Sequence, residues 1–232
     1  MGDLQRRLIA FDLDGTLVDS RQDLADSANE LIEELGGTPL STDAIALMVG
    51  EGAGVLVRRA LVAAGLSESA DALPRFLSIY DKRLLNNTKL YPGLRDVLSL
   101  ARAIGSVAVL TNKPLAPTER ILAALGLGDV VEHVIGGDGP YPRKPDPAGL
   151  FALMQAVGAD ADSTLLVGDS QVDRETARRA GTLCCLVTYG FGRVDGVESP
   201  REFIAEDAAG IAGVLRRFAD ARPSDPRLEF DK

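Results

Sequence analysis

The chain has no tryptophan, few aromatic residues of any kind (5%), two cysteines and one histidine in 232 residues. A single histidine, His133, is too few for a histidine-based zinc site. Cys184 and Cys185 are adjacent within an apolar run, so we expect buried thiols rather than a redox or metal-binding pair. So few cysteines fit a reducing compartment, and we expect a cytoplasmic protein.

Positive charge is also scarce: 25 Lys and Arg stand against 34 Asp and Glu, which gives a formal net charge of −9. Nucleic acids and membrane surfaces select for basic patches, so we expect neither as a partner. No apolar stretch approaches the ~18–20 residues that span a bilayer. No long apolar segment follows Arg6 and Arg7, so we expect no secretory signal. An anionic substrate would need a local cation, because the overall charge repels it.

The length and the 46% hydrophobic content allow a sizeable core. Short apolar runs predict strands at 8–11, 107–110, 164–167 and 183–187, with a weaker one at 130–135. Helical patterns cover about 93–104, 115–125, 147–157, 171–180 and 207–219. The runs are continuously apolar, which is typical of parallel strands covered on both faces. The alternation predicts an α/β fold with a doubly wound, mostly parallel sheet, whose ligands bind at the carboxyl ends of the strands.

Residues 20–89 interrupt this alternation with helical patterns and no strong strand. An apolar stripe from Leu24 to Leu35 predicts the first of these helices, and two more are expected over 55–64 and 71–85. We therefore predict a catalytic core of residues 1–19 and 90–232 and an inserted α-helical cap of residues 20–89. Asp19, Ser20 and Asp23 are expected to cap the first cap helix, and residues 222–232 are expected to lie loose on the surface.

Two carboxylates stand at the end of the first predicted strand, in the run Asp12-Leu13-Asp14-Gly15-Thr16. Side chains alternate along a strand, so Asp12 and Asp14 should point the same way, roughly 6–7 Å apart. Such a pair costs free energy unless a cation or a shared proton relieves it, which indicates a site. The run does not fit a calcium-binding EF-hand loop, because Gly15 is at loop position four rather than six and a strand precedes it.

Polar residues also follow the later strands. Thr111, Asn112 and Lys113 follow one strand, Gly168-Asp169-Ser170 follows another, and Asp173 comes one helical turn later. The pair Lys144-Pro145 precedes a predicted helix. Carboxylates, a hydroxyl, an amide and an ammonium are therefore expected around one edge of the sheet.

These four motifs, in this order and spacing, resemble those of haloacid dehalogenase superfamily phosphohydrolases with a helical cap inserted after the first motif. Within that superfamily, Val49-Gly50-Glu51-Gly52, Tyr91-Pro92-Gly93 and Gly136-Gly137-Asp138 are most similar to segments of phosphoglycolate phosphatases. The resemblance implies a Mg²⁺-dependent phosphomonoester hydrolase that acts on a small phosphorylated metabolite through an aspartyl-phosphate intermediate. The leading substrate is 2-phosphoglycolate.

The resemblance also implies roles for the carboxylates. Asp12 would be the nucleophile and a metal ligand. Asp14 would be the general acid and then the general base, and would bind the metal through its backbone carbonyl. Asp169 would complete the protein ligands of Mg²⁺, which prefers oxygen and keeps several waters.

Further residues would support the phosphoryl group. Thr111 and the amides near Asn112 would hydrogen-bond its oxygens, and Lys144 would supply balancing positive charge. Asp173 and Ser170 are expected just behind the metal ligands, where Asp173 would hold a metal-bound water or Lys144.

The predicted cap offers weaker candidates. Gly50 and Gly52 suggest a loop whose backbone approaches the ligand and helps to select it. Arg58 and Arg59 fit a solvated helix face, although either could reach a substrate carboxylate. Gly136 to Gly139 have the composition of a turn.

Several alternatives remain at this stage. Asp14 argues against a dehalogenase or a phosphonate-cleaving enzyme, because the members of the superfamily with those activities lack this aspartate. A sugar phosphate or pyrophosphate is an alternative substrate, and a phosphosugar mutase is a further possibility, although the cap has no obvious acid/base pair for one. Two alternatives from other functional classes stay open, a phospho-switch without turnover and a binding protein. The choice between monomer and homodimer also stays open.

Overall fold

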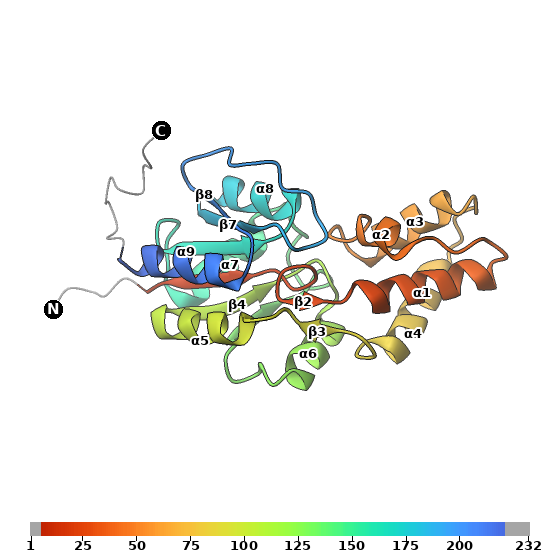
Figure 1. Ribbon diagram of the computed structural model, residues 1–232, viewed down its shortest axis with the longest axis horizontal. Coiled ribbons are helices and arrows are strands. Elements are labelled where there is room, and N and C mark those ends of the chain that lie inside the picture. The colour runs from red at the N-terminus through yellow and green to blue at the C-terminus, as the bar shows by residue number, and fades with distance from the viewer. Residues whose placement is uncertain (1–5, 221–232) are drawn as a thin grey trace.

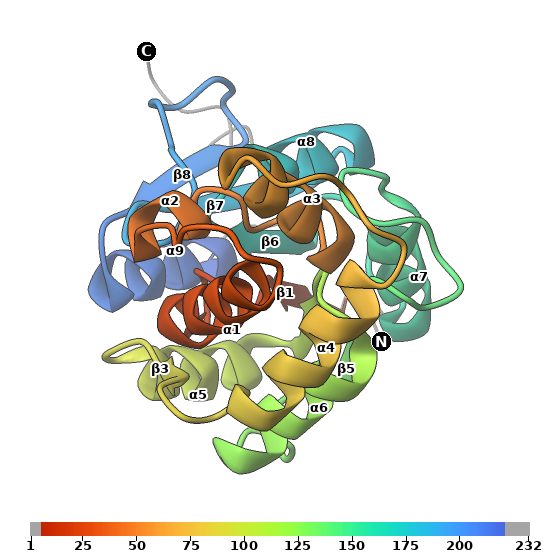
Figure 2. The same cartoon turned by 90° about the vertical axis from the view of Figure 1, so that its right-hand side faces the viewer.

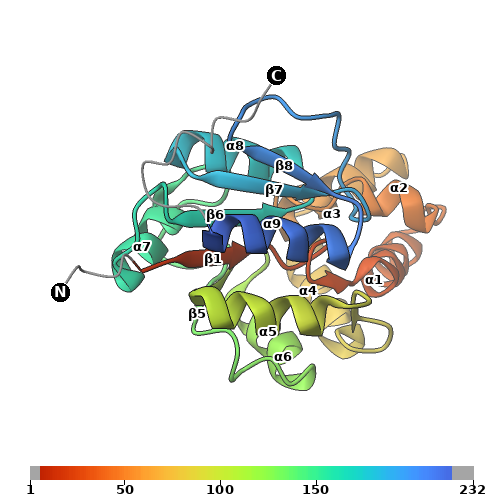
Figure 3. The same cartoon turned by 60° about the vertical axis from the view of Figure 1, so that its left-hand side comes forward.

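The computed structural model describes residues 6–220, which form a six-stranded parallel sheet flanked by helices. The strand order is β5-β4-β1-β6-β7-β8, so β1 lies inside the sheet (Figure 3). The strands are β1 (Leu8–Phe11), β4 (Ser106–Leu110), β5 (His133–Ile135), β6 (Thr164–Gly168), β7 (Leu183–Val187) and β8 (Glu202–Ala205). The predicted doubly wound α/β sheet is confirmed. The weak run at 130–135 forms only a three-residue strand, and β8 was not predicted.

Both faces of the sheet are covered. Ile9 and Phe11 of β1 belong to one buried cluster, which includes residues of α5 (Leu94–Ile104), α6 (Leu115–Ala124) and α9 (Ala208–Asp220). Leu8 and Ala10 belong to a second cluster, with α7 (Ala148–Val157) and α8 (Gln171–Ala180). Figure 3 shows α5 and α9 in front of the strands. Because successive side chains enter different cores, the strands have no polar face, which explains their unbroken apolar runs.

Four helices follow the first strand in the interval expected to form the cap. They are α1 (Arg21–Glu34), α2 (Thr42–Ala46), α3 (Ala53–Ala63) and α4 (Ala72–Arg83). They lie beyond one end of the sheet in Figure 1, and the view from that end shows them in front of β1 and β6 (Figure 2). The chain leaves through β2 (Val18–Asp19) and returns through β3 (Lys89–Leu90), which pair antiparallel. The helix α2 and the two-residue strands were not predicted.

The expected helix caps are only partly correct. Asp19 Oδ1 accepts a hydrogen bond from the N–H of Arg21, at the start of α1. Ser20 is the N-cap residue of α1, but its side chain makes no capping bond, and Asp23 lies in the first turn without capping it. The Ser20 hydroxyl donates to Asp14 Oδ1 at 2.5 Å. Asp23 is buried on α1, where it accepts bonds from the returning chain, and this satisfies backbone groups that precede β3.

Two further expectations can be examined in the described part of the chain. Cys184 and Cys185 lie buried and free on β7, as predicted. No helix within residues 6–220 has the length and apolar character needed to cross a membrane. The prediction for residues 222–232 lies outside the described residues.

Candidate active site

The carboxyl ends of three neighbouring strands bring the predicted site residues together. Asp12 directly follows β1, Thr111 follows β4 and Asp169 follows β6. The parallel register sets Phe11 beside Val167, so Asp12 and Asp169 leave the sheet within one residue of the same level. This is the edge at which open α/β sheets bind their ligands.

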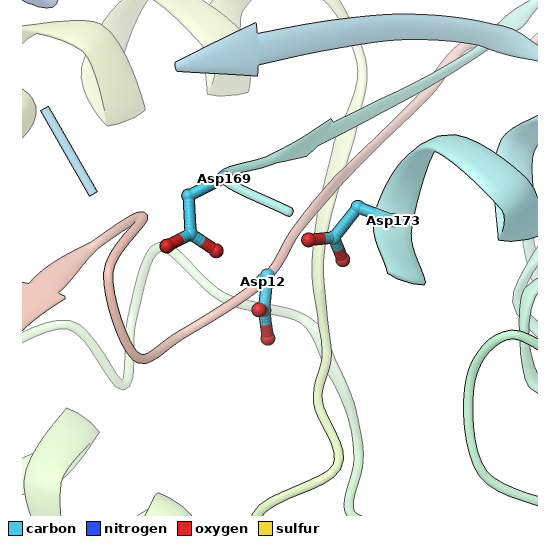
Figure 4. Close-up of side chains that lie close together, drawn as sticks. All are labelled: Asp12, Asp169 and Asp173. Atoms are coloured by element: carbon cyan, nitrogen blue, oxygen red, sulfur yellow. The ribbon is translucent and has the colours of Figure 1, made fainter. Parts of the chain in front are cut away.

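Asp12, Asp169 and Asp173 form a compact acidic cluster. One carboxylate oxygen of each lies within 4.8 Å of the others, and all three residues are buried. Figure 4 shows them converging from the ends of β1 and β6 and from the start of α8. The sequence predicted Asp12 and Asp169 together as metal ligands and Asp173 just behind them, whereas here Asp173 is part of the same cluster.

Burial and mutual repulsion disfavour the charged forms of these carboxyls. Burial, together with Asp173, raises the pKa of Asp12 to about 6 even though Lys144 opposes the shift. Burial and the other two carboxylates raise the pKa of Asp169 to about 7. The charged forms of these carboxyls therefore need positive charge close by.

Lys144 supplies part of the positive charge beside these carboxyls. Its Nζ lies 3.0 Å from Asp12 Oδ1 and donates to Asp173 Oδ1 at 2.6 Å. Burial works against the ammonium, but the two carboxylates outweigh it and raise the pKa of Lys144 above its ordinary value. Lys144 is therefore charged at neutral pH. The N–H of Leu13 donates to the same Asp12 oxygen, whereas no described residue bonds Asp12 Oδ2.

Asp173 is held from both sides. While Oδ1 accepts from Lys144, Oδ2 accepts from the hydroxyl of Ser170 at 2.6 Å and from its N–H at 3.2 Å. Ser170 is also the N-cap residue of α8. The helix start thus fixes the carboxylate that orients Lys144.

Glycines leave room for Asp169. A Cβ on Gly15 would lie 2.2 Å from Asp169 Oδ2, and one on Gly190 would lie 2.3 Å from the Asp169 Cβ. Oδ2 accepts from the N–H groups of Phe191 at 2.6 Å and Gly192 at 3.1 Å. No described residue bonds Oδ1, so this oxygen is available to a ligand.

This donor set fits a metal ion. The cluster offers only carboxylate oxygens, and one ammonium does not balance three carboxylates. Oxygen ligands of this kind suit hard divalent cations. Asp12 and Asp169, each with an oxygen that no described residue bonds, are the best placed to hold the ion.

Asp14 faces a different set of partners from Asp12. Its Oδ1 and Oδ2 lie 3.1 Å and 3.0 Å from Lys113 Nζ, and Oδ1 also accepts from Ser20. The turn that carries it needs Gly15, whose φ is +82°. The sequence placed Lys113 at this edge but gave it no role. Its signal was a charged residue in the segment that follows a strand, as Asp169 follows β6.

The phosphate-binding candidates Thr111 and Asn112 lie on the loop after β4. The Thr111 hydroxyl accepts from the N–H of Lys113 at 3.2 Å. The Asn112 side chain donates to the carbonyls of Gly50 and Lys144, both at 2.9 Å, and its own oxygen is buried without a partner among the described residues. Asn112 thus ties the Gly50 loop to the loop that carries Lys144.

A cavity of about 550 Å³ of empty space, partly open to solvent, lies between the helical insertion and this edge. Residues of both parts line it: Asp12, Asp14, Thr111, Asn112 and Lys113 from the edge, and Leu24, Val49, Gly50, Gly52, Ala53, Leu56, Phe76, Leu77 and Tyr80 from the insertion. Gly50 and Gly52 have φ of +117° and +95°, where a side chain would be strained. Lining residues come mostly from the insertion, so it shapes the space for a ligand.

Other candidates lie apart from the cavity. Arg58 and Arg59 are exposed on α3, and Arg59 pairs with Glu51 at 2.5 Å. Asp138 Oδ1 accepts from the N–H of Leu115 at 2.7 Å, so it caps α6 across the turn that starts at Gly136.

Comparisons with known proteins agree with this geometry. Residues 6–181 match the family model described as haloacid dehalogenase-like hydrolase. A phosphoglycolate phosphatase of Rhodospirillum rubrum is 43% identical over 196 residues, which cover 81% of each chain. One of Pseudomonas putida is 40% identical over 218 residues, 89% of this chain and 79% of the relative. A crystal structure described as a predicted phosphoglycolate phosphatase from Haemophilus somnus is similar at 31% identity with a TM-score of 0.82, covering 93% of this chain and 99% of its own.

Proposed function

The chain belongs to the haloacid dehalogenase-like hydrolases, and on this basis we propose that it is a Mg²⁺-dependent phosphomonoester hydrolase whose preferred substrate is 2-phosphoglycolate. Residues 1–19 and 90–232 are proposed as the catalytic core and residues 20–89 as the cap. The names of the relatives support the substrate. The buried, free cysteines support a reducing cytoplasm as its location.

The observation that carries this proposal is the placing of Asp12 between two different supports. On one side are Lys144 and the carboxylates of Asp169 and Asp173. On the other side Asp14 lines the cavity that would hold the rest of the ester. A phosphoryl group on Asp12 would therefore have the Lys144 ammonium and the proposed metal site on one side, and Asp14 as a proton donor for the leaving group on the other.

Two steps follow from this arrangement. A carboxylate oxygen of Asp12 attacks phosphorus, the bond from phosphorus to the ester oxygen breaks, and Asp14 donates its proton to the leaving alkoxide. Water then attacks the phosphorus of the aspartyl phosphate. Asp14 takes a proton from that water, and inorganic phosphate leaves as Asp12 is restored.

The remaining residues hold the phosphoryl group. Lys144 offsets its charge next to the nucleophile, and Thr111 with the amides near Asn112 hydrogen-bonds its oxygens. When bound by Asp12, Asp169 and the Asp14 carbonyl, Mg²⁺ would supply the positive charge that one lysine cannot. Asp173 and Ser170 position Lys144.

The test is a panel of small phosphate esters with free phosphate as the readout. We expect 2-phosphoglycolate to give the highest kcat/KM, ahead of sugar phosphates and pyrophosphate. A sugar phosphate in first place would overturn the substrate. A stable aspartyl phosphate without turnover would favour the phospho-switch, and no reaction with any member would remove the hydrolase assignment.

A further inference from the structure

Lys113 and Tyr80 form a polar pair in an otherwise apolar part of the cavity. Tyr80 lies on α4 of the insertion and Lys113 on the loop after β4, and Lys113 Nζ donates to the Tyr80 hydroxyl oxygen at 2.6 Å. Both residues are buried, with Tyr80 4% and Lys113 6% exposed. The insertion otherwise lines this space largely with apolar side chains such as Leu56, Phe76 and Leu77.

Lys113 is the one cation among the described residues that line the cavity. The other charged residues there are Asp12 and Asp14. Since the whole chain is strongly acidic, an anionic group on the leaving part of a substrate has this ammonium as its nearest attraction.

The Tyr80 hydroxyl has a hydrogen to donate. An ammonium can only donate, so the Tyr80 oxygen is the acceptor in its bond with Lys113. No described residue accepts the Tyr80 proton. Burial raises the pKa of Tyr80 to about 12, so the proton is present at neutral pH. The Tyr80 ring stacks with Phe76, their centroids 5.9 Å apart, which fixes its position.

We propose that Lys113 and Tyr80 form a subsite for a carboxylate on the leaving group of the substrate. This inference rests on the proposed function and assigns the residues that select its substrate. The carboxylate would replace one Asp14 oxygen in the shell of Lys113 and would accept the free proton of Tyr80. Both bonds are charge-assisted, which makes them strong in a buried site.

The subsite also limits the length of the substrate. Lys113 Nζ lies 3.0 Å and 3.1 Å from the two oxygens of Asp14, which would protonate the leaving oxygen. A carboxylate on Lys113 must therefore be close to the ester oxygen. One intervening carbon, as in 2-phosphoglycolate, suits this spacing better than the longer chain of 3-phosphoglycerate.

The experiment measures binding of two non-hydrolysable phosphonates by calorimetry in the presence of Mg²⁺. In 3-phosphonopropionate a methylene replaces the ester oxygen of 2-phosphoglycolate, and propylphosphonate differs only by a methyl in place of the carboxylate. We expect the unaltered protein to bind the carboxylate compound at least about tenfold more tightly. Tyr80→Phe and Lys113→Met should each reduce the ratio of the two affinities about tenfold, or bring it near one.

Matched controls make the same chemical changes elsewhere. Tyr141→Phe and Lys82→Met alter exposed residues and should keep the ratio. Equal binding of the two phosphonates, or a ratio unchanged in both test variants, overturns the subsite. A preference without hydrolysis of any ester would refute the proposed function and leave the subsite standing. Hydrolysis of 2-phosphoglycolate without a preference for the carboxylate compound would support the proposed function and refute the subsite.

Discussion

Lys144 Nζ donates to Asp173 Oδ1 across 2.6 Å, and neither side chain is more than 2% exposed. Because Asp173 is itself held by Ser170, the ammonium has one defined position, 3.0 Å from Asp12. The charge next to the proposed nucleophile is therefore set before a substrate arrives.

Replacing that charge should be costly. We expect Lys144→Met to lower kcat about 10²–10³-fold, because the variant loses preorganised positive charge at the phosphoryl group. Steady-state phosphate release measures this. Lys82→Met, an exposed change on α4, is the control and should keep native turnover. A loss below about threefold for Lys144→Met would contradict the assigned role.

Asp12→Asn should abolish phosphate release and covalent labelling together. An amide has no nucleophilic carboxylate oxygen, so no acid-stable phosphoprotein can form. Labelled substrate, acid quench and counting of protein-bound phosphate provide the measurement. Asp96→Asn replaces an exposed aspartate of α5 and should label normally. Near-native turnover in Asp12→Asn would show that the nucleophile lies elsewhere.

Asp14→Asn should slow turnover of 2-phosphoglycolate by about 10²–10⁴-fold, the usual contribution of general acid–base catalysis. With p-nitrophenyl phosphate the leaving phenolate needs no proton, so the same variant should still release a burst of p-nitrophenolate equal to the enzyme concentration. Stopped-flow absorbance resolves that burst. An equally slow first turnover with both substrates would argue against an acid role for Asp14.

Chelation should stop activity and added Mg²⁺ should restore it, with a strong dependence on pH. Because the pKa values of Asp12 and Asp169 are raised to about 6 and about 7, protons compete for these carboxyls as the pH falls through this range. Cations bind the deprotonated form, so apparent Mg²⁺ affinity should rise about tenfold or more from pH 5.5 to 7.5. Titration of the shift in melting temperature at each pH checks this. Affinity that is constant or falls with rising pH would contradict the cluster as the metal site.

Asp23→Ala should destabilise the protein without touching the site. Its carboxylate accepts bonds from the N–H groups of Asn87 and Thr88 and from the Thr88 hydroxyl. The loss of this carboxylate leaves buried donors unpaired, which costs about 1–3 kcal/mol in the free energy of unfolding. Denaturant unfolding measures the change, with Asp129→Ala on an exposed turn as the control. Equal stability in the two variants would contradict this account.

The core of the fold was predictable because its signals are local. The predicted strands are short apolar runs, and three of the four polar motifs directly follow a strand, whereas Lys144-Pro145 precedes α7. Strands β2 and β3 have two residues each, too few to show any period, and β8 begins with the charged Glu202, which leaves only three apolar residues. Such short elements depend on their neighbours, so their sequences carry little signal.

The site residues that follow neighbouring strands of the sheet were predictable. The contacts between the sheet edge and the helical insertion were not. The ends of β1 and β6 bring Asp12 and Asp169 together in any parallel sheet of this order. The contact of Lys113 with Tyr80 depends instead on how α4 packs over the edge. Asp23 was misread for the same reason, since its partners lie 64 and 65 positions further along the chain.

The insertion leaves the core at Asp19 and returns at Lys89, and these two residues are partners in the β2–β3 pair. Neighbouring strands lie only about 5 Å apart, so the two ends of the insertion are held at this short distance whatever the length of the insertion. Residues can be gained, lost or exchanged between those two points at a small entropic cost and without disturbing the register of the main sheet. Changes in the insertion can therefore alter which metabolite the site binds, while the proposed catalytic carboxylates keep their positions.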